Sequence, residues 1–452
     1  MAAGRARKGV YLAVLLAALV TALPSSTRGL PTPVSVGTKI QHVVIVFQEN
    51  HSFDDALGVL CVQDARCDGA TTGVLKDGTV IPLRAAPDLV PEVVHNVVSQ
   101  TTAIDGGKMD GFNLIVGCEV TTNYACYEQY APSRIPNLAA LARTFAISDR
   151  TFEDGPVPSW GAHLGLVAAQ FDGFVGDNPS TTAISVAPAG PGWGCDSKKD
   201  VLWRPPSGGR AIVVPSCVPK PDGSGPYRPS PVPYVPTIMD RLEDAGRSWH
   251  IYAPPAAPGS YNWAICPTFA ECIYGPQLGQ VKPSGQVITD AGAGTLPNFS
   301  IVIPCCRNSQ HNSASMLQGD NWIGQVVSAI MNGPQWSSTA IFIAYDDCGC
   351  FYDHVPPPAG LGIRVPMVIV SPYAKPVFTD SNTASFASLL AFTEHNFGLV
   401  PLTGKDTNAY DYSASFDFTQ RPLAPIALSQ HPVRASVKAW LEAHPEDKTD
   451  ST

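Results

Sequence analysis

Two pairs of polar residues in this sequence have side chains that bind divalent cations. The first pair is Glu49-Asn50 and the second is Asp346-Asp347, and each directly follows a run of uncharged, mainly apolar residues. Carboxylate and amide oxygens are hard ligands, which suit Mg²⁺, Ca²⁺ or Mn²⁺ and can also hold Zn²⁺ or Fe. Taken alone, an acidic pair after a strand is more often a solvated turn. Because both pairs occur at equivalent places, we hypothesise that they form one divalent metal site.

Ser159 is the candidate nucleophile. It follows the proline-rich segment 155–158 and precedes the apolar run 164–169. The prolines restrict the backbone, and the apolar run predicts a helix with Ser159 at its N-cap. A helix N-terminus has unpaired N–H groups and the positive end of the helix dipole, which suit a phosphoryl group. Two interpretations follow: a residue that only caps the helix, or a nucleophile that a divalent cation activates for in-line attack on phosphorus.

Three histidines are candidates for proton transfer in such a reaction: His95, His311 and His354. A histidine can protonate a leaving oxygen and later activate the water that hydrolyses a phosphoserine. A lone histidine in a loop is usually not catalytic. Each of the three is therefore a candidate only in combination with the polar pairs and Ser159.

The apolar runs before the two polar pairs predict buried strands. The runs 43–47 and 339–345 are typical of strands that are covered on both faces of a parallel sheet. Further strands are expected at 145–149, 248–253, 299–304 and 364–371, and helices at 135–143, 164–170, 321–331, 384–397 and 433–443. Together they predict an α/β fold with a doubly wound, mostly parallel sheet and helices on both faces. We expect the sheet to begin with a β-α-β unit that ends at residue 149.

The position of the polar pairs within that fold favours a shared site. In open α/β sheets the ligand crevice lies outside the carboxyl ends of the strands. Both pairs come directly after a predicted strand. We therefore expect them to lie at one edge of the sheet.

Composition favours one large domain. The chain has 452 residues, of which 44% are hydrophobic and 15% charged, enough to form a large core. We expect a single domain over residues 38–445 with loop insertions, the longest at 171–235. The net charge is −9 and the body of the chain contains no run of Lys and Arg. This argues against nucleic acid as a partner, and the oligomeric state stays open.

Residues 1–30 are predicted to be a secretory signal peptide. Arg5, Arg7 and Lys8 precede the apolar run 10–23. A membrane anchor is the alternative, but a spanning helix needs about 20 apolar residues and this run has roughly 14. Cleavage would remove four basic residues and lower the net charge from −9 to −13. We therefore expect a secreted or extracytoplasmic protein without a stable transmembrane anchor after cleavage.

Twelve cysteines agree with an oxidising compartment. Their spacing suggests four local disulfides that hold loops: Cys61/Cys67, Cys118/Cys126, Cys195/Cys217 and Cys266/Cys272. Four cysteines remain: Cys305, Cys306, Cys348 and Cys350. For these we expect two structural disulfides, with a zinc cluster as the alternative.

The candidate residues lie in segments that resemble a known protein family. Residues 40–54 resemble the opening signature of the bacterial and plant phosphoesterase family that includes non-specific phospholipases C and related acid phosphatases. The similarity continues through 107–112, 135–138, 148–150, 296–298, 309–311, 336–347, 351–358, 364–366 and 416–418. It therefore covers roughly residues 38–420.

The resemblance implies an alkaline-phosphatase/sulfatase-like fold and metal-assisted hydrolysis of phosphate esters through a Ser or Thr nucleophile. By position, the family's metal ligands and nucleophile fall on Glu49, Asn50, Asp346, Asp347 and Ser159. Its active-site histidines, which contact phosphate or the leaving group, fall on His95 and His311, and His354 lies in its Asp-His-Val-Pro-Pro motif. The domain at 38–445 would then be the catalytic domain.

The chain departs from the family's pattern after Ser159, where Gly161-Ala162-His163 replaces the usual Pro-Asn-Arg. The Asp346-Asp347 pair is similar to the acid phosphatase branch, and the sequence lacks the C-terminal β domains of longer bacterial phospholipases C. We therefore expect an acid-phosphatase-like enzyme that acts through a phosphoserine. A phospholipase C acting on phospholipid head groups is the alternative, and a secreted binding protein on a degenerate phosphoesterase scaffold is an alternative of another class.

Overall fold

The structure is a computed structural model, and it describes residues 1, 4, 39–254 and 261–444. Residues Ser35–Thr452 form one compact unit. The predicted signal peptide lies outside the described residues apart from residues 1 and 4. No described helix has the length and apolar character needed to cross a bilayer.

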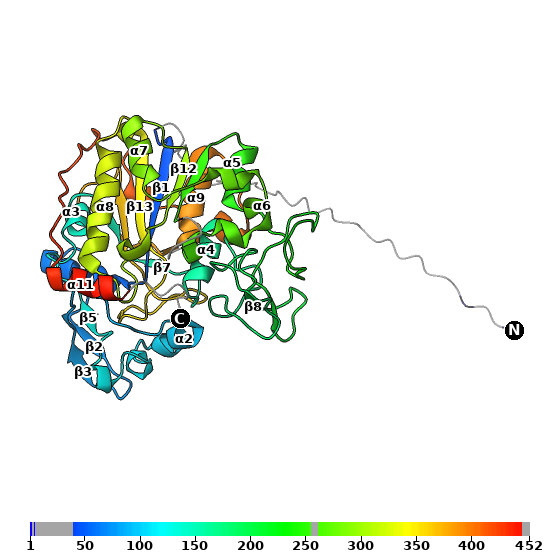
Figure 1. The fold of residues 1–452 in the computed structure, drawn as a ribbon, viewed down its shortest axis with the longest axis horizontal. Helices are drawn as coiled ribbons and strands as arrows, with labels where there is room; N and C mark the ends of the chain where they lie inside the picture. The colour runs from blue at the N-terminus through cyan, green and yellow to red at the C-terminus, as the bar shows by residue number, and fades with distance from the viewer. Residues whose placement is uncertain (2–3, 5–38, 255–260, 445–452) are drawn as a thin grey trace. The chain divides into compact units, whose positions relative to one another are not determined.

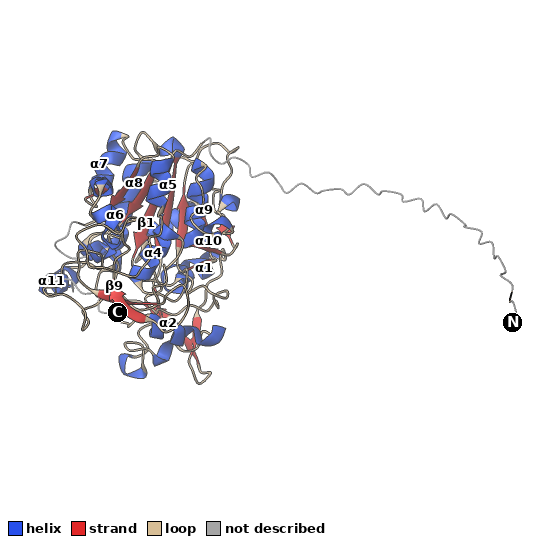
Figure 2. Cartoon of the chain, turned by 90° about the vertical axis from the view of Figure 1, so that its right-hand side faces the viewer, coloured by secondary structure: helices blue, strands red, loops and turns tan. Residues whose placement is uncertain are grey.

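An eight-stranded sheet forms the centre of the described unit (Figure 2). In spatial order its strands are β11 (Val281–Lys282), β10 (Trp249–Tyr252), β12 (Phe299–Val302), β1 (His42–Gln48), β13 (Thr339–Tyr345), β14 (Met367–Val370), β6 (Ala146–Ser148) and β15 (Thr379–Asp380). Neighbouring strands are parallel except where β14 pairs with β13 and β6. The predicted mostly parallel sheet is therefore confirmed.

Helices cover both faces of this sheet, as an α/β fold requires. Figure 1 shows α3 (Pro136–Thr144), α7 (Gln286–Ala293) and α8 (Met316–Met331) on one side of β1 and β13, and α4 (Ser159–Ala168), α5 (Ile238–Asp244) and α9 (Phe386–Phe397) on the other. On the first side α8 packs against α3 and α7, and on the second α4 packs against α5 and α9. The predicted doubly wound α/β fold is confirmed.

Shorter elements lie outside the central sheet. Four two-stranded sheets are formed by β2 (Thr72–Val74) with β3 (Val80–Pro82), β4 (Arg84–Ala85) with β5 (Glu128–Gln129), β7 (Thr151–Phe152) with β16 (Ala384–Ser385), and β8 (Asp200–Trp203) with β9 (Ile212–Pro215). The remaining described α-helices are α1 (Val59–Asp64), α2 (Val97–Ile104), α6 (Ala270–Ile273), α10 (Gly404–Thr407) and α11 (Ala435–Ala443). The predicted insertion at 171–235 thus contains its own β-hairpin, β8–β9.

Burial explains why β1 and β13 were recognisable in the sequence. All residues from 43 to 47 are fully buried, and so is every residue of β13. A central strand that is covered on both faces has no solvent side, so its sequence is continuously apolar. The expected initial β-α-β unit is wrong, because β13 and β14 lie between β1 and β6. Hydrophobic pattern identifies a strand but not its neighbour.

Four disulfides agree with the predicted local pairs: Cys61–Cys67, Cys118–Cys126, Cys195–Cys217 and Cys266–Cys272. Cys305 is also disulfide-bonded. The expectation of two further disulfides is wrong for Cys348 and Cys350, which are buried free thiols with their sulfurs 4.0 Å apart. Among the described residues, no group of three potential metal ligands contains a cysteine, so the zinc alternative has no support there.

Candidate active site

The two predicted polar pairs meet because their strands are neighbours. Gln48, the last residue of β1, is level with Tyr345, the last residue of the parallel strand β13. Both pairs therefore leave the sheet at the same edge, and all four of their side chains are buried. The backbone N–H of Asn50 donates to Asp346 Oδ1 at 3.0 Å. The structure thus brings the two pairs into contact at the carboxyl ends of their strands.

Ser159 is the first residue of α4, and its hydroxyl faces the polar pairs. The N-cap is Pro158, and the side chain that accepts from the first turn, at the Trp160 N–H, is that of Asn178, so the capping interpretation is wrong. Ser159 Oγ lies 3.3 Å from Glu49 Oε2, 3.4 Å from Asn50 Oδ1 and 3.3 Å from Asp347 Oδ2. A hydroxyl has one proton, so Ser159 can donate to only one of these oxygens.

The side-chain amide of Asn50 lies between the carboxylates and two of the predicted histidines. One end of the amide is 3.1 Å from Glu49 Oε2 and 3.0 Å from Asp346 Oδ1. The other end is 2.8 Å from His95 Nε2 and 2.9 Å from His311 Nε2. The orientation of the amide therefore decides whether its oxygen or its nitrogen faces the carboxylates.

The tautomers of the two histidines define that orientation. His95 Nδ1 lies 2.9 Å from the Val93 carbonyl oxygen, and His311 Nδ1 lies 3.3 Å from the Asn312 carbonyl oxygen. A carbonyl oxygen only accepts, so in the neutral rings Nδ1 carries the proton and Nε2 is an acceptor. The Asn50 NH₂ group then donates to both rings and its oxygen faces the carboxylates. In the opposite orientation the Asn50 NH₂ group would donate to Glu49 Oε2 and Asp346 Oδ1, and its oxygen would accept from the Nε2–H groups of both rings.

This arrangement fits a divalent cation. Several oxygens converge with too few protons between them, and Asp346 Oδ2 has no hydrogen-bond partner among the described residues. Burial, together with the charge of Asp347, raises the pKa of Asp346 to about 7. Buried carboxylates that face one another need a proton or a cation between them. The residues that could hold the cation are Glu49, Asn50, Asp346, Asp347 and Ser159.

Backbone N–H groups orient the second acidic pair. Asp346 Oδ1 accepts from the Asp347 N–H at 2.8 Å, and Asp347 Oδ1 accepts from the Gly349 N–H at 2.7 Å. These contacts leave the Oδ2 atom of each carboxylate directed into the cluster. Gly349 has a φ of +55°, and a Cβ there would lie 2.3 Å from the Asn50 carbonyl oxygen. Only glycine fits this turn without moving the backbone.

His163 also reaches the cluster, although sequence reasoning did not select it. It lies one helical turn after Ser159 on α4, with Nε2 3.4 Å from Glu49 Oε1 and 3.8 Å from Asp346 Oδ2. Burial lowers the pKa of His163 to about 3, so the ring is neutral. Its separation of four residues from Ser159 in a predicted helix was the available signal, because such residues share a helix face.

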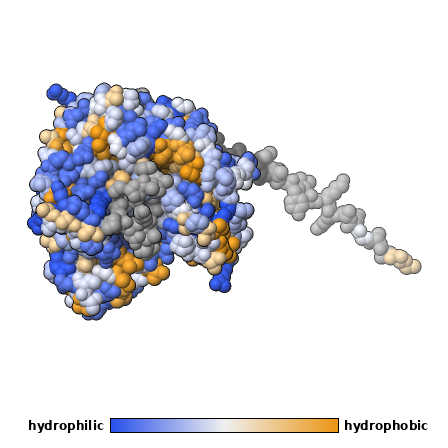
Figure 3. Space-filling model, viewed as in Figure 1, coloured by the Kyte–Doolittle hydropathy of each residue, from blue (hydrophilic) through white to orange (hydrophobic). Residues whose placement is uncertain are grey.

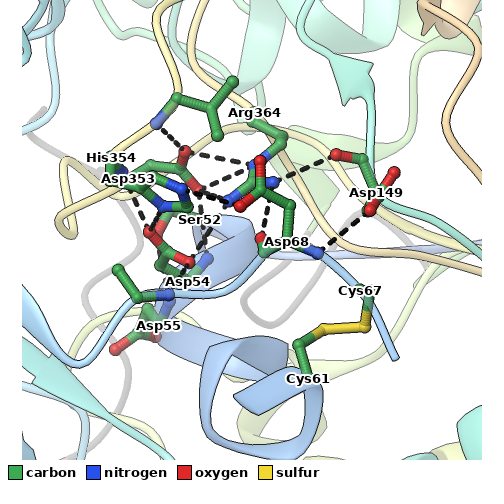
Figure 4. A network of polar contacts seen from close by, with 12 residues as sticks. Ser52, Asp54, Asp55, Cys61, Cys67, Asp68, Asp149, Asp353, His354 and Arg364 are labelled. Atoms are coloured by element: carbon green, nitrogen blue, oxygen red, sulfur yellow. Dashed lines mark hydrogen bonds and ion pairs between the residues drawn. A yellow bond between two sulfur atoms is a disulfide. The ribbon is translucent and has the colours of Figure 1, made fainter. Parts of the chain in front are cut away.

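His354 lies in a second polar network, apart from the cluster around Ser159. Its Nδ1 is 2.5 Å from Asp54 Oδ2 and its Nε2 is 3.0 Å from Asp68 Oδ1. Figure 4 shows His354 and these aspartates together with Asp353 and the buried guanidinium of Arg364. Arg364 Nε donates to Asp353 at 3.1 Å and Nη2 to Asp54 at 3.2 Å. The network joins the segment after β1 to the segment before β14.

We expect this second network to lose stability as the pH rises. Burial acts to lower the pKa of His354, but the hydrogen bond and charge of Asp54 outweigh it and leave the pKa above 6.5. A histidine whose pKa is raised by folding stabilises the folded state fully at pH values below its unfolded pKa. This stabilisation is lost as the pH rises through its folded pKa. His354 is partly exposed, so the expected loss in the free energy of unfolding is only on the order of 1 kcal/mol.

Denaturant unfolding from about pH 6 to about pH 9 checks this prediction. The His354→Gln protein should lack the part of the pH dependence that the imidazolium contributes. His395→Gln is the matched control, because His395 also contacts a carboxylate, Asp411 at 2.9 Å, but its side chain is 45% exposed. Identical pH profiles for the wild type and His354→Gln would contradict the prediction.

Comparison with known proteins agrees with the family that the sequence resembles. Residues 40–400 match a model described as the phosphoesterase family. Phospholipase C A of Mycobacterium tuberculosis is 25% identical over 88% of this chain and 81% of its own length. Non-specific phospholipase C3 of Arabidopsis thaliana is 21% identical over 92% of this chain and 81% of its own length. Non-hemolytic phospholipase C of Burkholderia pseudomallei is 29% identical over 36% of this chain and 32% of its own length.

One similar solved structure is a protein in the alkaline phosphatase superfamily from Vibrio parahaemolyticus. The match covers 82% of this chain and 69% of that protein's chain, with a TM-score of 0.39 and 12% identity. The family match contains the whole cluster around Ser159 and covers most of the chain. The protein is thus a phosphoric ester hydrolase, and the chain belongs to the phosphoesterase family.

Proposed function

We propose that this protein hydrolyses phosphate esters with a divalent metal ion and with Ser159 as the nucleophile. One observation carries the proposal: Ser159 Oγ lies within 3.4 Å of oxygens from Glu49, Asn50 and Asp347. A divalent cation held by this cluster would offset negative charge on the phosphoryl oxygens and favour ionisation of a nearby hydroxyl. A serine hydroxyl alone is a weak nucleophile near neutral pH.

The residues of the cluster have separate tasks in this proposal. Glu49, Asp346 and Asp347 supply charge to hold the cation, and Asn50 supplies its amide oxygen. Ser159 attacks phosphorus, so that its Oγ–P bond forms as the bond to the leaving oxygen breaks. Water then hydrolyses the phosphoserine and releases phosphate or its monoester.

The two histidines differ in access to solvent. His95 is fully buried and holds the Asn50 amide, so we assign it a positioning role. His311 is partly exposed and can meet a substrate. We propose that the His311 ring releases Asn50 when substrate binds and becomes protonated at Nε2. It then gives that proton to the leaving oxygen and regains a proton from the water that attacks the phosphoserine. His354 contacts other carboxylates and takes no part in this scheme.

Two substrate classes remain candidates. The Asp346-Asp347 pair, similar to the acid phosphatase branch, favours a phosphomonoester. The names of the relatives favour a phospholipid head group, and so do aliphatic side chains that are exposed at Leu114, Val116 and Val120. Figure 3 shows that apolar residues form separate patches on the visible face. Such patches suit transient contact with lipid.

We also propose that the protein is exported and that residues 38–445 form its single catalytic domain. The basic residues before the apolar run 10–23 support a signal peptide. The four described disulfides support export as well, because disulfides persist in oxidising compartments and are rare in the cytosol.

Hydrolysis of p-nitrophenyl phosphate and p-nitrophenyl phosphorylcholine tests the proposed function. We expect chelation to lower turnover of the preferred substrate by at least about 100-fold and metal add-back to restore it. Preference for the monoester would support an acid phosphatase, whereas preference for the choline diester would support a phospholipase C. Hydrolysis that survives complete removal of metal would contradict the proposal.

A further inference from the structure

The loop that carries His311 is tied to the end of β1 and to the residues that follow it. The backbone carbonyls of three successive residues, 308, 309 and 310, accept hydrogen bonds from segment 48–51. The donors are the side-chain amide of Gln48 to Asn308 at 3.1 Å, the backbone N–H of Glu49 to Ser309 at 3.1 Å, and the ring of His51 to Gln310 at 3.0 Å. Segment 48–51 thus contains two of the proposed metal ligands and also holds the loop before His311.

Gln310, the residue directly before His311, has an unusual backbone. Its φ is +67°, in the left-handed region that residues other than glycine seldom adopt. The residue is fully buried. Its side-chain oxygen accepts from the Tyr345 hydroxyl at 2.7 Å, and its side-chain nitrogen donates to the Met316 carbonyl oxygen at 2.9 Å. Such a conformation persists only where the surroundings hold it, and the hydrogen bond from His51 is one of the contacts that do so.

His51 is itself held by a carboxylate and by aromatic packing. Its side chain is fully buried, and Nδ1 lies 2.6 Å from Asp55 Oδ2. The ring stacks on Phe351, with centroids 5.3 Å apart and planes at 22°. Tyr130 and Tyr345 lie edge-on to it, each with a centroid distance of 5.6 Å. Because a backbone carbonyl oxygen only accepts, Nε2 carries a proton and is the donor of the hydrogen bond to the loop.

The reaction proposed above makes the position of the His311 backbone important. His311 Nε2 lies 2.9 Å from the Asn50 amide, and its ring releases this amide when substrate binds. The ring packs beside Trp263 and His95, with a centroid distance of 5.6 Å to each. A proton donor must lie within hydrogen-bond reach of the leaving oxygen, and a misplacement of about 1 Å can cost about 10²-fold in rate. The peptide before His311 therefore decides whether the released ring reaches the substrate.

We propose that His51 is a positioning residue for His311. Its hydrogen bond to the Gln310 carbonyl holds the peptide that places the His311 ring beside the leaving oxygen. Asp55 orients the His51 ring, so a chain of contacts runs from Asp55 through His51 and the Gln310 carbonyl to His311. The inference rests on the proposed function, because it takes His311 as the group that gives a proton to the leaving oxygen.

The leaving group distinguishes this role from a purely structural one. An alkoxide is a strong base and needs a proton as its bond to phosphorus breaks, whereas 2,4-dinitrophenolate is a stable anion and needs none. A displaced His311 should therefore slow the hydrolysis of an alkyl ester far more than that of the 2,4-dinitrophenyl ester. General damage to the fold would slow both alike. The quantity to compare is kcat/KM, because it includes the step in which the leaving oxygen departs.

The test is kcat/KM of His51→Leu for the ethyl and the 2,4-dinitrophenyl esters of phosphate, or of phosphorylcholine if the enzyme prefers the diester. Leucine fills much of the volume of the imidazole but cannot donate a hydrogen bond. We expect a loss of at least about 100-fold for the ethyl ester and of no more than about fivefold for the dinitrophenyl ester. His51→Gln should recover most of this loss, because its amide nitrogen can take the place of Nε2.

His42→Leu is the matched control. His42 lies on the same strand, β1, and its Nδ1 is 2.9 Å from another backbone carbonyl oxygen, that of Pro297. This variant should leave kcat/KM for both esters unchanged. His311→Gln is the reference for the selective loss, because it removes the proton donor itself.

The outcomes separate this inference from the proposed function. If His311→Gln is selective but His51→Leu slows both esters equally or neither, the positioning role is wrong and the proposed function stands. If His311→Gln slows both esters equally, the proton transfer assigned to His311 is wrong and the inference falls with it. Should His51→Leu not fold because Asp55 loses its partner, His51→Asn keeps an amide toward Asp55 but is too short to reach the Gln310 carbonyl. It should show the same selective loss, and a uniform loss or none would overturn the positioning role.

Discussion

Replacement of Ser159 by alanine should lower kcat on the preferred phosphate ester by at least about 10⁴-fold, a loss of the size seen when a covalent nucleophile is removed. The hydroxyl is buried at the first position of α4 and faces oxygens of Glu49, Asn50 and Asp347. No other serine or threonine hydroxyl makes a described contact with these oxygens. The substitution removes one oxygen atom from a helix start that does not use it as a cap, so the fold should persist.

Steady-state kinetics measures the loss of kcat, and thermal unfolding of the same preparations checks that the fold persists. Ser300→Ala is the matched control, because Ser300 is also fully buried and its hydroxyl has no hydrogen-bond partner among the described residues. Ser300 lies on β12, which neighbours β1. We expect the control to retain turnover. A Ser159→Ala protein that keeps a few per cent or more of wild-type turnover would exclude the covalent mechanism.

Replacement of Asp346 by asparagine should have opposite effects on function and on the stability of the metal-free protein. Bound metal should fall well below the wild-type content, and kcat/KM should fall by about 10²–10⁴-fold, because a charged ligand is lost. The metal-free protein, however, should become more stable above about pH 7. Burial and the charge of Asp347 raise the pKa of Asp346 to about 7, so the ionised carboxylate opposes folding.

The sign of that stability effect follows from the coupling between protonation of the carboxyl group and folding. A carboxyl group whose pKa is raised by folding destabilises the folded state as the pH rises from the unfolded pKa, 3.8, to the folded one. Asparagine does not ionise, so the variant should gain about 1–3 kcal/mol in the free energy of unfolding at alkaline pH without metal. With metal present, the wild type should be the more stable of the two proteins.

Metal analysis and denaturant unfolding, with and without chelator, check both effects. Asp172→Asn is the control, because burial also raises the pKa of Asp172 to about 7 and the residue is buried outside the Ser159 cluster. It should change neither metal content nor kcat/KM. If Asp346→Asn retained the full wild-type metal content, Asp346 would not be a ligand.

Much of the fold was predictable because local sequence reports local burial. The continuously apolar runs identified β1 and β13, and four disulfides followed from cysteines that are close in sequence. The polar pairs were recognisable because each begins where a buried strand ends. Apart from the Cys195–Cys217 disulfide, whose cysteines are 22 residues apart, these features depend on residues no more than 8 positions apart.

The placement of single side chains was less predictable. His354 looked equivalent to His95 and His311 as a loop histidine, but Asp54 and Asp68 hold it in another network. Ser159 was expected at the N-cap of a helix that in fact begins one position earlier, with Ser159 as its first residue and its hydroxyl facing the carboxylates. His163 stood out only as a departure from the family's pattern. A shift of one residue along a helix rotates a side chain by about 100°, so small errors in an element boundary change what a side chain faces.

By itself, the sequence determined the type of each long element, the mostly parallel α/β class and the positions of polar residues at two strand ends. Only the tertiary structure decided that β1 lies beside β13, that Asn50 is held between carboxylates and histidines, and that His163 faces Glu49 and Asp346. The reason is physical: hydrophobic periodicity records how one segment is buried, whereas strand order and side-chain contacts arise from packing between segments that are hundreds of residues apart.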